Sequence, residues 1–274
     1  MTRSTLRQQI ADALRDEVLA GRLQPGQEFT VKEIAATYEV SATPVREALV
    51  DLTAQGLLDS IQHRGFQVHR FSVEDFRGMV EARSLIVDGI FRRDGAPRVA
   101  LGPGPALGSV RRRAEEAARA ARATDVDILI GYDVRFWREL GALVSNVYIA
   151  DFLHRLRVQA WVFAVPHLRA ESDLRTWLWS GHDELAEAIG SGDARTARDL
   201  IMAHNAHALA WADRLERRAG HGLRLPHLGD SEDCGDPEGR GDRGHPGASG
   251  VPGQRRDPGR PGEPGYSGSP LAPQ

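Results

Sequence analysis

Apolar residues recur every three or four positions in the first part of the chain, which is the spacing of one buried helix face. Residues 6–20 carry this pattern and stop before Gly21, a residue type that often ends helices. Thr30 and Glu33 have the spacing of a capping box, which opens a second helix. A third helix over 41–56 follows after a short turn. The pattern therefore predicts a helix-turn-helix preceded by one further helix.

The apolar period changes after residue 56. Residues 57–63 and 66–70 have the composition of short strands, and Arg64-Gly65 between them is a turn signal. Two strands joined by a tight turn make a β-hairpin. We therefore predict a winged helix-turn-helix domain over residues 4–71, with this hairpin as the wing.

Residues 72–218 show helical periodicity and no further strand signals. Pro166 is expected to end one helix, and Gly190 to Asp193 to separate the last two. The fold class is therefore mainly α, with a winged helix-turn-helix followed by an all-α helical bundle. The helices predicted for the bundle span 73–94, 105–122, 125–144, 147–165, 172–189 and 194–218.

The composition changes again near residue 221, where Gly, Pro, Asp and Arg replace core-forming residues. Such a segment cannot bury enough apolar surface to fold, so a disordered tail is predicted over 221–274. Glycines between Gly241 and Gly268 follow a three-residue period that is broken at Arg256. A collagen triple helix is disfavoured, because the repeat is short and interrupted and would require trimers.

Composition and charge narrow the class of protein. The 274 residues are 41% hydrophobic, enough for two globular domains, and no run of eighteen apolar residues occurs, so we expect a soluble, cytoplasmic protein. The single cysteine, Cys234, excludes a disulfide or a Cys-based zinc site within one chain. With a formal net charge of -3, DNA binding would require the basic residues to gather on one face.

Two segments of the first domain have a distinctive sequence. Gly21 to Gly26 reads GRLQPG, and Val40 to Leu49 reads VSATPVREAL. These segments resemble the DNA-binding domain of the GntR family of transcriptional regulators, and the resemblance runs from Leu6 to Val68. It implies a winged helix-turn-helix that binds operator DNA. Many members have Arg where this chain has Ala42, so a different operator preference is expected.

The resemblance also suggests which residues contact DNA. Arg46 lies one turn into the third helix, from which a guanidinium can reach the major groove and bind a guanine edge. The alternative is that Arg46 pairs with Glu47 or Asp51 on a solvated face. The other candidates would contact phosphates, base edges or the minor groove: Lys32, Ser41, Thr43, His63, Arg64 and Gly65.

A second resemblance lies in the helical half, where His182 to His204 reads HDELAEAIGSGDARTARDLIMAH. This segment is similar to the FCD ligand-binding domain of the fatty-acid-regulator branch of the GntR family, over about residues 73–216. The resemblance implies an effector site with Asp133, His182 and His204 as three ligands of a divalent metal such as Zn, Ni, Mn or Fe. Trp137 stands where the fourth ligand, a histidine, is expected.

Two interpretations of this site remain open. Asp133, His182 and His204 lie on apolar stripes, and buried ionisable groups are costly unless paired, so they should converge. In the first, the three residues bind a metal, and water, the effector or His207 completes its coordination shell. In the alternative, the cavity holds no metal, Asp133 bonds to a histidine and Trp137 fills space.

Arg83 also lies on an apolar stripe, with Met79 and Val87. A buried guanidinium requires an anion, and the resemblance assigns an arginine to the effector pocket. The position of Arg83 therefore predicts an organic-acid effector. The alternative is an internal ion pair between Arg83 and Asp133. Arg111 to Arg113 is interpreted as a solvated helix face.

Together these features predict a homodimeric regulator, not an enzyme, that represses by binding a palindromic operator and responds to a small metabolite. One rival is a DNA-binding protein without an effector, whose bundle is only structural. Another is a metal-dependent hydrolase or lyase that would use Asp133, His182 and His204.

Overall fold

The structure is a computed structural model that describes residues 5–92 and 105–222, with side chains up to residue 218. These residues belong to one compact unit, Met1–Leu225. They are mainly helical, with one small sheet, as the sequence predicts. The predicted tail and its glycine repeat lie outside the described residues, apart from the end of the last helix.

The N-terminal part is a winged helix-turn-helix. Thr30 and Glu33 form the predicted capping box, because the Thr30 hydroxyl accepts from the Glu33 amide and the Glu33 carboxylate accepts from the Thr30 amide. The sheet is antiparallel, in the order β1-β3-β2. Its elements are α1 (Leu6–Leu19), β1 (Glu28–Phe29), α2 (Val31–Thr37), α3 (Ala42–Ala54), β2 (Leu58–Ile61) and β3 (Gly65–Val68). The sequence did not predict β1, because two residues are too few to show a period.

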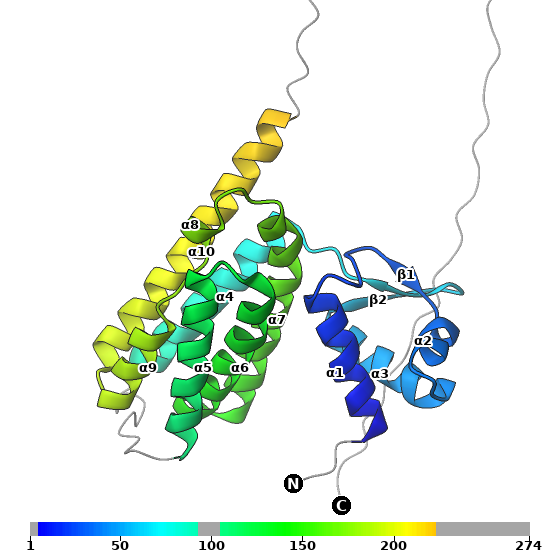
Figure 1. Cartoon of the computed structure of the whole chain (residues 1–274), viewed down its shortest axis with the longest axis horizontal. Coiled ribbons are helices and arrows are strands. Elements are labelled where there is room, and N and C mark those ends of the chain that lie inside the picture. Colours follow the sequence, from blue (N-terminus) through cyan, green and yellow to red (C-terminus); the bar gives the residue numbers. More distant parts are fainter. Residues whose placement is uncertain (1–4, 93–104, 223–274) are drawn as a thin grey trace, which may run out of the picture. The chain divides into compact units, whose positions relative to one another are not determined.

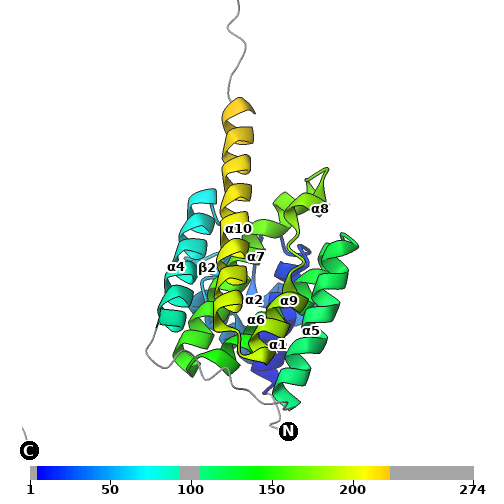
Figure 2. The same ribbon diagram turned by 90° about the vertical axis from the view of Figure 1, so that its left-hand side faces the viewer.

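The helical bundle follows this domain. Its helices are α4 (Val73–Arg92), α5 (Pro105–Arg122), α6 (Val126–Val144), α7 (Val147–Arg169), α8 (Leu174–Trp177), α9 (His182–Ser191) and α10 (Ala194–Gly222). Helix α4 packs against α7 and α10, and α5 packs against α6 and α9 (Figures 1 and 2). The helices α4, α6, α7, α9 and α10 each contribute a side chain to the site described below.

Two predicted helix boundaries are wrong. Helix α7 continues through Pro166 to Arg169, because the buried Phe163, Val165 and Leu168 hold this turn in the core although proline donates no backbone hydrogen bond.

The single helix predicted over 172–189 is in fact two, α8 and α9. Leu178 is extended between them, and Trp179 packs its ring 4.5 Å from the rings of both His182 and His204. A Cβ on Gly181 would lie 2.8 Å from the Trp179 ring, so the glycine allows this packing. Burial of the indole therefore outweighs continuation of the helix.

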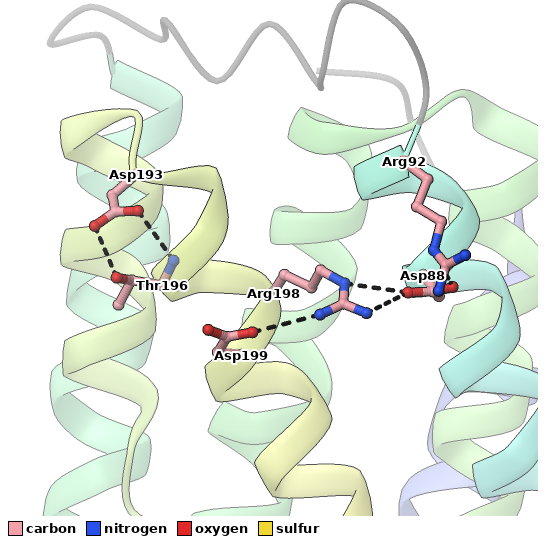
Figure 3. A network of polar contacts seen from close by, with 6 residues as sticks. All are labelled: Asp88, Arg92, Asp193, Thr196, Arg198 and Asp199. Carbon is pink, nitrogen blue, oxygen red and sulfur yellow. Dashed lines mark hydrogen bonds and ion pairs between the residues drawn. The ribbon is translucent and has the colours of Figure 1, made fainter.

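Helix α10 begins at a capping aspartate and is tied to α4 by one arginine. Asp193 accepts hydrogen bonds from the Thr196 amide at 3.0 Å and the Thr196 hydroxyl at 2.7 Å. Arg198 donates to Asp88 of α4 from Nε at 3.1 Å and from Nη2 at 2.5 Å, and Figure 3 shows it lying between Asp88 and Asp199. These contacts hold together the two helices that carry Arg83 and His204.

His154, a partly buried residue of α7, makes the stability of the fold sensitive to acid. Burial, with Arg138 and Arg15 nearby, lowers its pKa to about 4 from 6.5, although Asp151 opposes the shift. The unfolded chain therefore takes up this proton first as the pH falls. We expect the melting temperature to decrease between about pH 6.5 and pH 4 because of this residue, and no further decrease from it at lower pH.

Thermal denaturation of wild type and His154→Gln over this range tests the expectation. The variant should lose less stability, although part of the decrease should remain because burial also lowers the pKa of His167 and of His204. Identical profiles for the two proteins would show that His154 has no such role.

Candidate functional site

Helix α3 presents Arg46 to solvent. Val45 and Leu49 of the same helix are fully buried, whereas Arg46 is exposed, so the packing of α3 fixes this orientation. Asp51 pairs with Arg7 at 3.0 Å. Among the described residues, the Arg46 side chain has no ion pair or hydrogen bond, so the alternative pairing with Glu47 or Asp51 is not formed. The guanidinium is free for an external partner.

The start of α3 offers further hydrogen-bonding groups to an anion. Ser41 is the N-cap residue, but its hydroxyl makes no capping hydrogen bond, and Thr43 beside it is exposed. Free backbone amides at a helix N-terminus bind phosphate readily. Lys32 is exposed on α2. Nothing in this arrangement opposes the predicted contacts to the DNA backbone, which remain predictions.

The wing tip is built from unusual backbone conformations. His63 has φ +62° and Gly65 has φ +122°. A Cβ on Gly65 would lie 2.5 Å from the carbonyl oxygen of Phe29 in β1, so the fold itself requires a glycine here. His63 and Arg64 are exposed beside it. The structure thus gives Gly65 a role in folding that is independent of any contact with DNA.

The second candidate site is centred on Asp133 of α6, which is 3% exposed. Its Oδ1 accepts hydrogen bonds from Trp137 Nε1 at 2.9 Å and, in the tautomer protonated there, from His182 Nε2 at 2.9 Å. Its Oδ2 accepts from Trp161 Nε1 at 2.6 Å and lies 4.0 Å from Arg157. Asp133 therefore joins α6, α7 and α9.

Arg157 of α7 joins this cluster to His204 of α10. Its Nη1 donates to His204 Nε2 at 2.9 Å, and its guanidinium lies 4.3 Å from the centre of the Trp137 ring. The rings of Trp137 and His204 stack at 5.5 Å. Sequence reasoning predicted that Asp133, His182 and His204 should converge. The structure pairs His182 with Asp133, and it places Arg157, which that reasoning missed, between Asp133 and His204.

A sequence signal for Arg157 did exist. Leu153, Trp161 and Ala164 lie four before, four after and seven after it, so Arg157 falls on an apolar stripe as Arg83 does. The same stripe would have identified Trp161.

The electrostatics of the cluster leave one positive charge without a partner. Burial alone would raise the pKa of Asp133, but Arg157 and the hydrogen bond from His182 outweigh it and hold the pKa well below its usual range. Burial, followed by Arg157 and Arg83, keeps the pKa of His204 well below 6.5, so this ring is neutral at neutral pH. Two guanidinium groups therefore face one carboxylate.

Arg83 of α4 carries the uncompensated charge. It is 5% exposed, and it has no hydrogen bond or ion pair within the part of the chain that the structure describes; its Nε atom is buried without a partner. The predicted alternative, a pair between Arg83 and Asp133, is not formed. Burial and the neighbouring Arg157 lower the pKa of Arg83, but a guanidinium gives up its proton so reluctantly that an anion is the usual remedy.

Arg83 and Arg157 line two adjoining cavities. The larger, of about 80 Å³, also has Trp161, Trp177 and Trp179 in its wall. The smaller, of about 50 Å³, is lined mainly by aliphatic side chains. Both cavities therefore bring a ligand to the same two guanidinium groups.

The residues of this site do not fit a divalent metal. The atoms of Asp133, His182 and His204 that face one another are already hydrogen-bonded, and the Arg157 guanidinium stands among them and would repel a cation. His207 does not complete a set, since its Nε2 lies 3.3 Å from the Trp177 carbonyl oxygen. Among the described residues, no group of three or more His, Cys, Asp or Glu is placed to bind a metal.

Comparison with known families covers both parts of the chain. Residues 6–68 match the family of bacterial regulatory proteins called gntR, and residues 99–207 match the FCD domain. A probable D-xylose utilization operon transcriptional repressor of Paenarthrobacter nicotinovorans is 28% identical over 205 residues, which are 74% of this chain and 87% of that protein. The HTH-type transcriptional repressor RspR of Escherichia coli K12 is 33% identical over 86 residues, 31% of this chain and 38% of that protein.

Solved structures show the same fold. McbR/YncC of E. coli has a TM-score of 0.63 at 18% identity, over 78% of this chain and 99% of that one. A putative GntR regulator from Rhodococcus sp. RHA1 has a TM-score of 0.56 at 20% identity, over 81% and 100%. No helix among the described residues is long and apolar enough to cross a membrane. The chain belongs to the GntR family of bacterial transcriptional regulators, with an FCD domain after its DNA-binding domain.

Proposed function

We propose that this DNA-binding regulator is a homodimeric repressor that leaves its operator when a small carboxylate binds between Arg83 and Arg157. The observation that carries the proposal is the Arg83 guanidinium, which lies in the wall of a cavity and has no partner among the described residues. An ionised group buried without a partner is unfavourable, so it is retained where a ligand supplies the opposite charge. A carboxylate accepts two parallel hydrogen bonds from one guanidinium and suits this position.

Repression and dimerisation are supported by the relatives of this chain and by the geometry of operator binding. Both of the relatives described above are named repressors. A single winged helix buries too little DNA surface for high specificity, whereas a dimer places two recognition helices in successive major grooves of a palindrome. Effector binding needs to change the operator affinity of such a dimer by only about 1–3 kcal/mol.

The two rival functions find less support. A purely structural bundle has no reason to bury Arg83 without a partner. A metal-dependent hydrolase would need Asp133, His182 and His204 to bind a metal and an activated water, but their facing atoms are committed to hydrogen bonds.

The proposed function can be tested by fluorescence anisotropy with DNA from the region upstream of the protein's own gene. We expect specific binding at moderate salt and its reversal by at least one acid from a panel of mono-, di- and tricarboxylates. Specific binding that none of these acids alters, together with no acid-dependent shift of the melting temperature, would favour the DNA-binding protein without an effector.

The same site leads to a prediction about metals. Incubation with Zn²⁺, Ni²⁺ or Mn²⁺ should leave the melting temperature unchanged, and a chelator should not weaken the response to a carboxylate, since no group of three or more metal ligands is gathered in the part of the chain that the structure describes. Metal analysis of the purified protein by mass spectrometry should find less than one equivalent. A stoichiometric metal whose removal abolishes the response would contradict this expectation.

A further inference from the structure

The aromatic residues of the chain gather around the proposed effector site. All five tryptophans line one of the two cavities that share Arg83 and Arg157. Four of them line the larger cavity, together with Phe76: Trp161, Trp177, Trp179 and Trp211. The smaller cavity is lined by Trp137 and Phe91 together with aliphatic side chains such as Leu140 and Ile201. The larger cavity therefore has most of the tryptophans, and the smaller one has more aliphatic side chains.

The charge of the site sets the charge of its ligand. Arg83 and Arg157 contribute two positive charges, and Asp133, at 4.0 Å from Arg157, contributes one negative charge. His182 and His204 are engaged with Asp133 and with Arg157. A ligand with one negative charge makes the cluster neutral, whereas a tricarboxylate would bury two further negative charges without partners.

The size of the site limits the ligand to a small one. The two cavities, of about 80 Å³ and about 50 Å³, together approach the roughly 150 Å³ in which benzene is known to bind inside a protein. These volumes set one small ring as the upper limit for the ligand, so they exclude a long acyl chain or a coenzyme.

We infer that the effector is an aromatic monocarboxylate, with its ring among the tryptophans of the larger cavity and its carboxylate between Arg83 and Arg157. This inference rests on the proposed function and specifies its ligand. Rings packed edge-on or offset against indoles gain affinity beyond that of their buried area. A saturated ring of similar size and equal charge lacks this gain and provides the comparison.

Isothermal titration calorimetry on the full chain, with benzoate and cyclohexanecarboxylate as probes, tests the inference. We expect benzoate to bind roughly tenfold more tightly, as two favourable aromatic contacts would give. Benzamide, which has the ring without the charge, and citrate, which has charge without the ring, should both bind more weakly than benzoate.

A pair of variants separates a specific ring contact from a general loss of stability. Trp177 lines the larger cavity and stacks on His207, but it takes no part in the hydrogen bonds of Asp133. Trp177→Leu should reduce the preference for benzoate over cyclohexanecarboxylate at least several-fold. Phe152→Leu removes an aromatic ring of α7 that lines neither cavity, and it should leave the preference unchanged.

The outcomes distinguish this inference from the proposed function. Equal affinity for the two probes, tighter binding of citrate, or no binding of benzoate at millimolar concentration would overturn the aromatic effector. If an aliphatic acid then releases the operator, and if this release depends on Arg83, the proposed function stands although the aromatic effector is excluded. If no carboxylate binds at all, both fail.

Discussion

Arg46→Ala should weaken specific operator binding by roughly 10- to 100-fold, because a bidentate contact between a guanidinium and guanine contributes about 1–3 kcal/mol of discrimination. Arg46 is exposed on α3 and has no partner among the described residues, so the substitution removes no interaction of the folded protein. The melting temperature should therefore stay the same. Anisotropy titrations with an operator fragment and with unrelated DNA measure the two affinities.

The ratio of these affinities carries the information. Loss of a base contact reduces specific binding much more than non-specific binding, whereas loss of a phosphate contact weakens both and lowers the salt dependence. Arg112→Ala is the matched control, because Arg112 is an exposed arginine of α5, in the stretch interpreted as a solvated face. An unchanged ratio in Arg46→Ala would exclude Arg46 as the residue that reads the sequence.

Arg83→Met and Arg157→Met should change stability in opposite directions. Arg83 is buried and has no partner within residues 5–92 and 105–218, so an apolar side chain of similar length should stabilise the ligand-free protein and raise its melting temperature by roughly 2–4 °C or more. Arg157 is the cation beside Asp133 and the donor to His204, so its loss leaves buried groups unpaired. That loss should cost about 3–5 kcal/mol and lower the melting temperature by roughly 10 °C.

The two variants should nevertheless share one functional defect. Each removes a guanidinium that lines both cavities, so neither protein should release the operator when a carboxylate is added. Differential scanning fluorimetry combined with anisotropy measures both properties on the same samples. Destabilisation of Arg83→Met would mean that Arg83 has an internal partner, and a normal response to carboxylates in that variant would remove Arg83 from the effector site.

The order of the elements and the class of protein could be predicted from the sequence because their signals are local. The capping box of Thr30 and Glu33 spans one helical turn, and the segment from Val40 to Leu49 holds nearly all the features of a recognition helix. A motif of this kind is complete within a few residues of the chain. The mainly helical fold and the membership in the GntR family are accordingly confirmed.

Signals of this kind failed where tertiary contacts outweighed local preference. Proline usually ends or kinks a helix, but the buried residues around Pro166 keep α7 continuous. Trp179 has no local reason to interrupt a helix, yet its contacts with His182 and His204 divide the predicted helix into α8 and α9. In both places the gain from burial exceeds the cost to the backbone.

The sequence by itself determined that Asp133, His182 and His204 had to be buried and paired, because charged and polar groups on apolar stripes are costly otherwise. Only the tertiary structure decided which groups pair with these three residues. The partners of Asp133 come from helices distant in sequence, with His182 separated from it by 49 residues and Trp161 by 28. Periodicity shows which face of a helix is buried, but it carries no information about which other helix meets that face. The place of the Arg157 guanidinium among these groups, where the sequence left a metal and a metal-free cavity both open, follows from that packing alone, as does the lack of a partner for Arg83 among the described residues.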